Sequence, residues 1–130
     1  MNTYLIAAAA LAFLVGLIHS VLGESMVFSR MRQGQLVPTY GGAVLREPHV
    51  RILWASWHVL TVLGWALAGV LLLLAIEPAA HGFRSYVLPI ITLAMFVAAM
   101  LVLFGTKARH PGWIGLLGVA VLTWLGTGPS

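Results

Sequence analysis

Two histidines and one carboxylate stand at places in this chain where they could meet and do chemistry. His19 and Glu24 lie near the end of one apolar segment, and His58 lies near the start of the next. At 1.5 Å rise per residue, both imidazoles lie roughly 6 to 11 Å inside the same end of their segments. Ionisable groups inside a bilayer are costly and are usually paired or functional. These three residues are therefore the first candidates for a site.

The chemistry of these groups suggests a bound cofactor. His19, Glu24 and His58 offer nitrogen and oxygen ligands suited to a divalent metal such as zinc, iron, manganese or copper. The two imidazoles could instead be axial ligands of haem b from facing helices. Neither segment carries an HxxxH or ExxH pair that would place two ligands on one helix face. The cofactor stays unknown, with a divalent metal and haem b as candidates.

The second apolar segment has a polar face that predicts a pocket. Arg51, Trp54, His58, Thr61 and Trp65 follow i, i+3, i+4 and i+7 spacing, so they share one side of a helix. Trp65 lies near mid-membrane, where its indole N–H needs an acceptor. A quinone, lipid or other amphiphile could place its head against this face and its tail between helices.

A structural interpretation competes with these ligand hypotheses. In it, Glu24 pairs with Arg51, and the two histidines hydrogen-bond to Ser20, Thr61, Trp65 or a water, so that the network fixes helix register. Catalysis has little support, because the neighbours His19 and Ser20 point to different helix faces and do not form a base and nucleophile. The sequence favours a non-catalytic role and identifies no catalytic residue.

The elements that position these residues are membrane-spanning helices. Of 130 residues, 61% are hydrophobic and 8% are charged, unlike a soluble domain. Hydrocarbon offers no hydrogen-bond partner to backbone amides, so apolar segments of about 20 residues must be helical. We expect an all-α fold, an integral membrane four-helix bundle forming one domain over residues 1–130. Its helices are predicted at 4–23, 51–76, 86–104 and 112–126, and the last is short for a ~30 Å hydrocarbon core.

The basic residues predict the orientation. Lys and Arg near span ends stay in the cytoplasm, and here six of seven flank two loops, as Arg30, Arg32, Arg46, Arg51, Lys107 and Arg109. Only Arg84 lies in the other loop, so both termini are predicted outside and loop 24–50 in the cytoplasm. Because these charges are juxtamembrane rather than gathered in a separate patch, they indicate anionic membrane lipids as partners and no nucleic acid.

Small residues predict where the helices pack. Ala8, Ala12, Gly16, Ser20 and Glu24 recur at every fourth position. A second stripe comprises Gly112, Gly115 and Gly118, and a third Ala94 and Ala98. In lipid such stripes let helices approach closely. We expect packing within one chain, and a homodimer or larger membrane complex is the rival interpretation.

The predicted cytoplasmic loop has local signals of its own. A helical continuation is expected from Glu24 to Gln33, with a stop at Gly34. Pro38 to Gly42 is typical of a turn, and Pro48 favours a break before the second helix.

Two strings in the first two spans also carry a resemblance. GLIHSVLGE, residues 16–24, and RILWASWHVLTVLGWALAG, residues 51–69, resemble a group of small bacterial inner-membrane proteins of four predicted helices. The resemblance implies a multi-pass protein of the bacterial inner membrane and no reaction, ligand or partner. From the polar residues themselves we expect a non-catalytic binding, accessory or assembly protein with an inner-leaflet site at His19, Glu24, Arg51, Trp54, His58 and Trp65.

Overall fold

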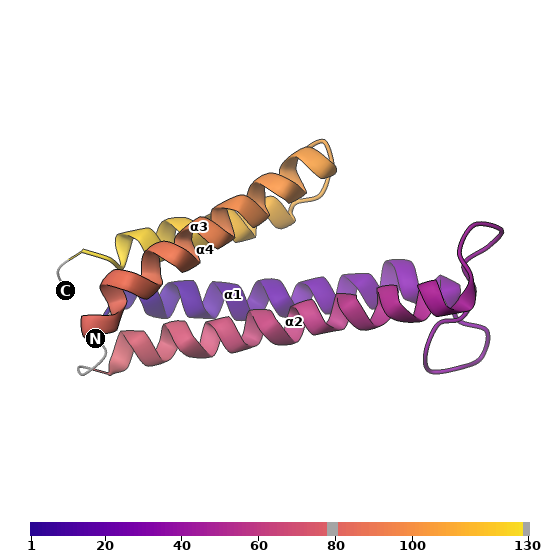
Figure 1. Cartoon of the computed structure of the whole chain (residues 1–130), viewed down its shortest axis with the longest axis horizontal. Coiled ribbons are helices and arrows are strands. Elements are labelled where there is room, and N and C mark those ends of the chain that lie inside the picture. Colours follow the sequence, from indigo (N-terminus) through magenta and orange to yellow (C-terminus); the bar gives the residue numbers. More distant parts are fainter. Residues whose placement is uncertain (78–80, 129–130) are drawn as a thin grey trace. The chain divides into compact units, whose positions relative to one another are not determined.

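The computed structural model describes residues 1–77 and 81–128, and this part of the chain is all-helical (Figure 1). In chain order the elements are α1 (Thr3–Leu22), the π-helical turn η1 (Gly23–Val27), the 3₁₀ turn η2 (Phe28–Met31), α2 (Glu47–Ile76), α3 (His81–Gly105) and α4 (Gly112–Leu125). Three long apolar helices and one shorter helix are consistent with the expected four-helix bundle. The predicted all-α class is confirmed.

Three stretches of helix are long and apolar enough to cross a membrane: Thr3–Met31, Glu47–Ile76 and Gly82–Gly105. The chain is thus a membrane protein. The fourth helix, α4, has 14 residues, about 21 Å at 1.5 Å per residue, and is the shorter apolar helix that the sequence predicted.

Two helices begin earlier than predicted. α2 starts at Glu47 rather than at residue 51, and α3 starts at His81 rather than at residue 86. The expected break at Pro48 is wrong, because proline is tolerated in the first helical turn, where its missing N–H has no partner to lose. Because α3 begins at His81, Pro89 lies inside the helix.

The chain divides into two compact units, which are described separately. The first comprises Met1–Val15 and Gly64–Ser130, and the second comprises Gly16–Leu63. The core of the first unit consists of apolar side chains from all four helices, among them Leu5, Ala8, Ala12, Leu71, Leu74, Leu88 and Val119.

Glycine allows α4 to lie close to α1 in the first unit. A Cβ on Gly115 would collide with the side chain of Val15, and a Cβ on Gly118 would stand 2.8 Å from Leu11 Cδ2. Ala8 and Ala12 on α1 are buried. The prediction that these small-residue stripes pack helices within one chain is confirmed at these positions.

Two buried polar side chains, Asn2 and Arg84, bind backbone groups near the helix ends of the first unit. Asn2 Oδ1 accepts the backbone N–H of Leu5 at 3.2 Å, and Asn2 Nδ2 donates to the Gly126 carbonyl at 3.0 Å. Arg84 Nε donates to the Leu74 carbonyl at 2.7 Å. The last carbonyls of a helix lack intrahelical partners, so Arg84 stabilises the end of α2.

We predict that Gly115→Leu destabilises the protein, because the added side chain must push α4 away from Val15. Overpacking of this kind costs about 1–3 kcal/mol, which should appear as a lower melting temperature of the detergent-solubilised protein. Gly69→Leu is the matched control, since a Cβ there meets no atom within 4 Å. Equal melting temperatures for the two variants would contradict the close packing of α1 and α4.

Candidate functional site

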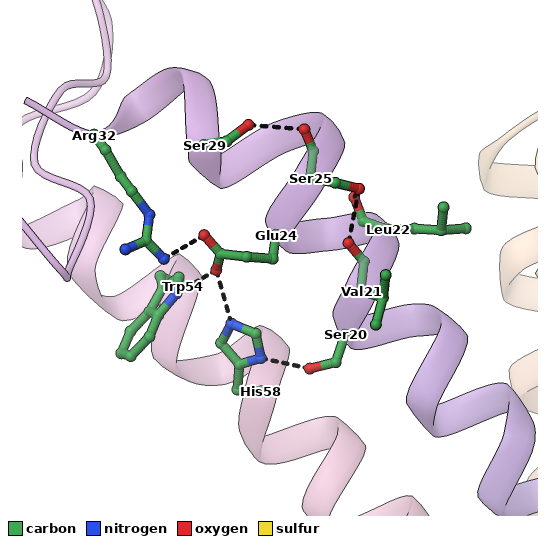
Figure 2. A network of polar contacts seen from close by, with 9 residues as sticks. All are labelled: Ser20, Val21, Leu22, Glu24, Ser25, Ser29, Arg32, Trp54 and His58. Atoms are coloured by element: carbon green, nitrogen blue, oxygen red, sulfur yellow. Dashed lines mark hydrogen bonds and ion pairs between the residues drawn. The ribbon is translucent and has the colours of Figure 1, made fainter.

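Within the second unit, α1 ends at Leu22 and the chain departs from regular α-helical winding. Gly23–Val27 forms a π-helical turn and Phe28–Met31 a 3₁₀ turn. Ser25 Oγ donates to the Val21 carbonyl at 2.8 Å, and Ser29 Oγ donates to the Ser25 carbonyl at 2.7 Å (Figure 2). The predicted helical continuation is thus confirmed as far as Met31. π-Helical turns change the register of the residues that follow them and are frequent at functional sites.

Glu24 lies in this turn and gathers three partners (Figure 2). Its Oε1 forms an ion pair with Nη2 of Arg32. Its Oε2 accepts a hydrogen bond from the Trp54 indole N–H at 3.2 Å and lies 3.5 Å from Nε2 of His58. Both carboxylate oxygens are therefore engaged, and the partners come from the end of the α1 segment and from α2.

His58 continues the network toward Ser20. Its Nδ1 lies 2.5 Å from Ser20 Oγ, so that Glu24, the imidazole and the hydroxyl form a continuous chain (Figure 2). With the proton on Nε2, the ring donates toward Glu24 and accepts from Ser20, which satisfies both nitrogens. The Trp54 ring meets the imidazole edge-on, with centroids 5.0 Å apart. The structure therefore confirms the predicted contact between a histidine and Ser20.

His19 occupies a separate aromatic stack. Its ring lies parallel to the Trp57 indole, with centroids 4.3 Å apart and planes 7° apart. The Trp57 N–H donates to the His19 carbonyl at 3.0 Å, and Phe28 packs edge-on against the same indole. A Cβ on Gly23 would collide with Trp57, so this glycine makes room for the stack.

Sequence reasoning missed two residues of this cluster, Trp57 and Arg32. Trp57 had a signal, because it stands next to His58 and one turn after Trp54. Arg32 had none, because in a regular helix eight positions separate the two Cα atoms by about 12 Å along the axis. The π and 3₁₀ turns bring them together.

The predicted pair of Glu24 and Arg51 is wrong. Arg51 instead binds Glu47 one turn earlier, with Nη2 2.7 Å from Oε1, and both side chains are largely exposed. The early start of α2 explains this, because it supplies Glu47 as a carboxylate at the favourable i, i+4 spacing.

Trp65 belongs to the first unit and the cluster to the second. It finds the acceptor that its depth predicted, the Phe13 carbonyl at 3.2 Å, and it stacks on the Phe13 ring with centroids 5.3 Å apart. Both residues belong to the first unit. Thr61 is buried but its Oγ1 has no hydrogen-bond partner among the described residues, so it does not hold His58. Of the six predicted site residues, the structure links Glu24, Trp54 and His58 directly, and it connects His19 to His58 through the rings of Trp57 and Phe28.

This geometry bears on the predicted cofactors. Within residues 1–77 and 81–128, no three His, Cys, Asp or Glu side chains lie close enough together to hold a metal ion. The set His19, Glu24 and His58 is thus not assembled as a ligand set. Both ring nitrogens of His58 face protein partners, and an axial haem ligand would need one of them. The cofactor predictions gain no support from the arrangement.

The order of carboxylate, imidazole and hydroxyl is also that of hydrolytic triads. A nucleophilic serine needs backbone or side-chain donors aimed at the developing oxyanion. Ser20 lies inside α1, where backbone amides donate along the helix. The arrangement therefore fits a polar clamp between the end of α1 and the start of α2 better than an acyl-transfer site.

The loop after Met31 folds back onto the end of the 3₁₀ turn. The backbone N–H groups of Thr39 and Tyr40 donate to the Met31 carbonyl at 3.1 and 3.0 Å. Pro38 is buried, and Gly41 pairs with Leu45 in an isolated bridge around Gly42, whose φ is +68°. The turn thus lies at residues 42–44, later than the predicted Pro38 to Gly42, and backbone hydrogen bonds give the loop a defined shape.

Comparisons with known proteins add no family to this geometry. No protein-family model, curated protein or solved structure matches the chain. The resemblance of residues 16–24 and 51–69 to small bacterial inner-membrane proteins therefore stays a prediction, and the function has to be inferred from the contacts described above.

We predict that Glu24→Gln destabilises the protein by about 1–2 kcal/mol, because an amide loses the charge-assisted contact with Arg32 and weakens those with Trp54 and His58. The melting temperature of the solubilised protein measures this loss. Glu47→Gln is the matched control, because an exposed i, i+4 ion pair contributes about 0.3–0.5 kcal/mol. If both variants lowered the melting temperature equally, Glu24 would not be the centre of the clamp.

Proposed function

We propose that the chain is a small, non-catalytic accessory protein of a bacterial inner membrane, and that it docks a partner membrane protein through the loop of residues 33–46. The observation that carries this proposal is the combination of a folded loop with uncovered apolar side chains. Leu36 and Val44 are 79% and 87% exposed, and Tyr40 is about half exposed. Exposed apolar groups on an ordered surface are typical of interaction sites.

The clamp explains why the loop can serve as a docking surface. The ion pair between Arg32 and Glu24 holds the first residue after the 3₁₀ turn, and the Met31 carbonyl binds the middle of the loop through Thr39 and Tyr40. A loop that is ordered before it binds loses less conformational entropy on association. In this proposal the polar cluster has a positioning role and makes no contact with substrate.

The charge pattern supports a cytoplasmic location for the loop. Residues 32–46 contain Arg32 and Arg46 and no acidic residue, and basic loops beside membrane spans stay inside. Both termini would then lie outside. The same charges favour a partner surface that carries carboxylates.

The accessory role and a cofactor function differ in whether the purified protein contains haem or metal. We expect the detergent-purified protein to show no Soret band and no stoichiometric metal, because His58 is occupied on both nitrogens by Ser20 and Glu24. An absorption spectrum and elemental analysis of the same sample test this. A Soret band or a bound metal that disappears in both His19→Ala and His58→Ala would overturn the accessory role in favour of a haem or metal protein.

The docking role is tested by a photoreactive amino acid placed at Val44 in the full-length chain in its native membrane. We expect a protein adduct of one defined mass, because Val44 is uncovered and the loop is fixed. The same adduct should weaken in an Arg32→Gln background, which releases the loop, and persist with Arg51→Gln, whose ion pair lies outside the cluster.

Other adducts would point elsewhere. A photoreactive group at the exposed polar residue Gln33 is the control, because it measures how often a nearby position of the same loop is crosslinked to proteins that do not bind it specifically. An adduct of twice the chain mass would identify a homodimer as the partner. Adducts with lipid alone, or equal adducts from position 33, would overturn the docking proposal and support an amphiphile-binding role.

A further inference from the structure

The last turns of α3, in the first unit, carry an open apolar hollow. Its volume is about 290 Å³, and it is lined by Val97, Met100, Leu101, Phe104 and Gly105. Leu101 and Phe104 are 70% and 75% exposed, and a Cβ on Gly105 would meet no atom within 4 Å. The hollow therefore opens to the surroundings of the helix, which are lipid in a membrane protein.

A rigid basic turn follows the hollow directly. Lys107 and Ala108 have φ of 51° and 60°, in the left-handed region. Thr106 Oγ1 donates to the Val102 carbonyl at 2.7 Å and accepts the His110 N–H at 3.3 Å. The Lys107, Ala108 and Arg109 amides all donate within the turn. The turn is thus closed by its own hydrogen bonds, while the side chains of Lys107 and Arg109 are exposed.

No carboxylate balances these two charges. Glu77 is the last acidic residue in the chain, and α3 separates it from the turn by 25 residues, or about 37 Å. Neither Lys107 nor Arg109 forms an ion pair within the described part of the chain. Two unpaired cations side by side favour an anionic ligand.

The hollow and the turn follow one another along α3 in the order of the acyl chain and the phosphate of one phospholipid. The candidate membrane span Gly82–Gly105 ends at the hollow, and Lys107 follows two residues later. An acyl chain lying in the hollow would therefore have its phosphate at the level of the turn, where basic residues beside a span contact headgroups. We propose that this end of α3 binds one anionic glycerophospholipid, with a chain in the hollow and the phosphate at Lys107 and Arg109.

The apolar hollow beside two basic side chains distinguishes this site from a general attraction of basic loops to anionic membranes. Arg30 and Arg46 are also exposed basic residues, and general attraction would affect them in the same way. A site needs both the charges and the apolar hollow. The proposal does not rest on the docking function of the loop, because the site lies on α3 and the turn that follows it.

The experiment is a lipid titration followed by native mass spectrometry of the full-length protein released from detergent micelles. Phosphatidylglycerol is compared with phosphatidylcholine of the same acyl chains. We expect one phosphatidylglycerol to be retained in preference to phosphatidylcholine. Lys107→Gln combined with Arg109→Gln should reduce that preference about tenfold or more, the effect of two basic residues near an anionic headgroup.

Two further variants separate the site from general charge. Gly105→Leu, which fills the hollow, should weaken the binding of phosphatidylglycerol although no charge is removed. The double variant Arg30→Gln and Arg46→Gln, which removes the same charge elsewhere, should leave the preference unchanged. The helical circular dichroism of each variant shows that the fold is retained.

The outcomes that overturn the proposal are equally distinct. Equal retention of the two lipids would exclude an anionic headgroup site. A similar loss in the variants of residues 30 and 46 would reduce the effect to net charge. An unchanged affinity in Gly105→Leu would show that no chain lies in the hollow. If glycerol phosphate, which lacks acyl chains, displaced the lipid fully, the turn alone would be a phosphate site and the lipid proposal would fail.

Discussion

A carboxylate at the end of a membrane helix has to be stabilised by the chain itself, because hydrocarbon provides neither hydrogen bonds nor counterions. Glu24 is in this position, and the second unit is arranged around it. The π turn presents the carboxylate, Arg32 neutralises it, and Trp54 and His58 bind its other oxygen. Without these partners an ionised Glu24 would favour the aqueous interface, and the polar contacts of α1 with α2 at this end would be reduced to those of Ser20 with His58 and of His19 with Trp57.

The two units therefore use different means to hold helices together. In the first, Gly115 and Gly118 let α4 approach α1 until side chains interdigitate, and the gain comes from van der Waals contact. In the second, the ring stack of His19 with Trp57 and the chain from Glu24 to Ser20 provide directional contacts. Directional contacts such as these fix one register of the paired helices.

The helices could be predicted from the sequence, because hydropathy and length decide them in a membrane. The residues of the cluster could be predicted only in part. Glu24, Trp54 and His58 were found from depth and helical spacing, since both quantities follow from regular geometry. The partner of Glu24 could not be found in this way, because the π and 3₁₀ turns break the periodicity on which the reasoning depends. Arg51 was misplaced for a related reason, since one additional turn at the start of α2 supplied Glu47 as a nearer carboxylate.

The placement of the charges connects the fold to its surroundings. Two of the three acidic residues, Glu24 and Glu47, pair with arginines of their own chain, and Arg84 donates to the carbonyls that end α2. Four basic residues make no ion pair within the described chain: Arg30, Arg46, Lys107 and Arg109. Their combined charge equals the formal net charge of +4. All four lie in the segments that the distribution of basic residues assigns to the cytoplasm. Internal pairing thus maintains the fold, and the charge that remains is available for an anionic surface, which is what both the proposed docking loop and the proposed lipid site would require.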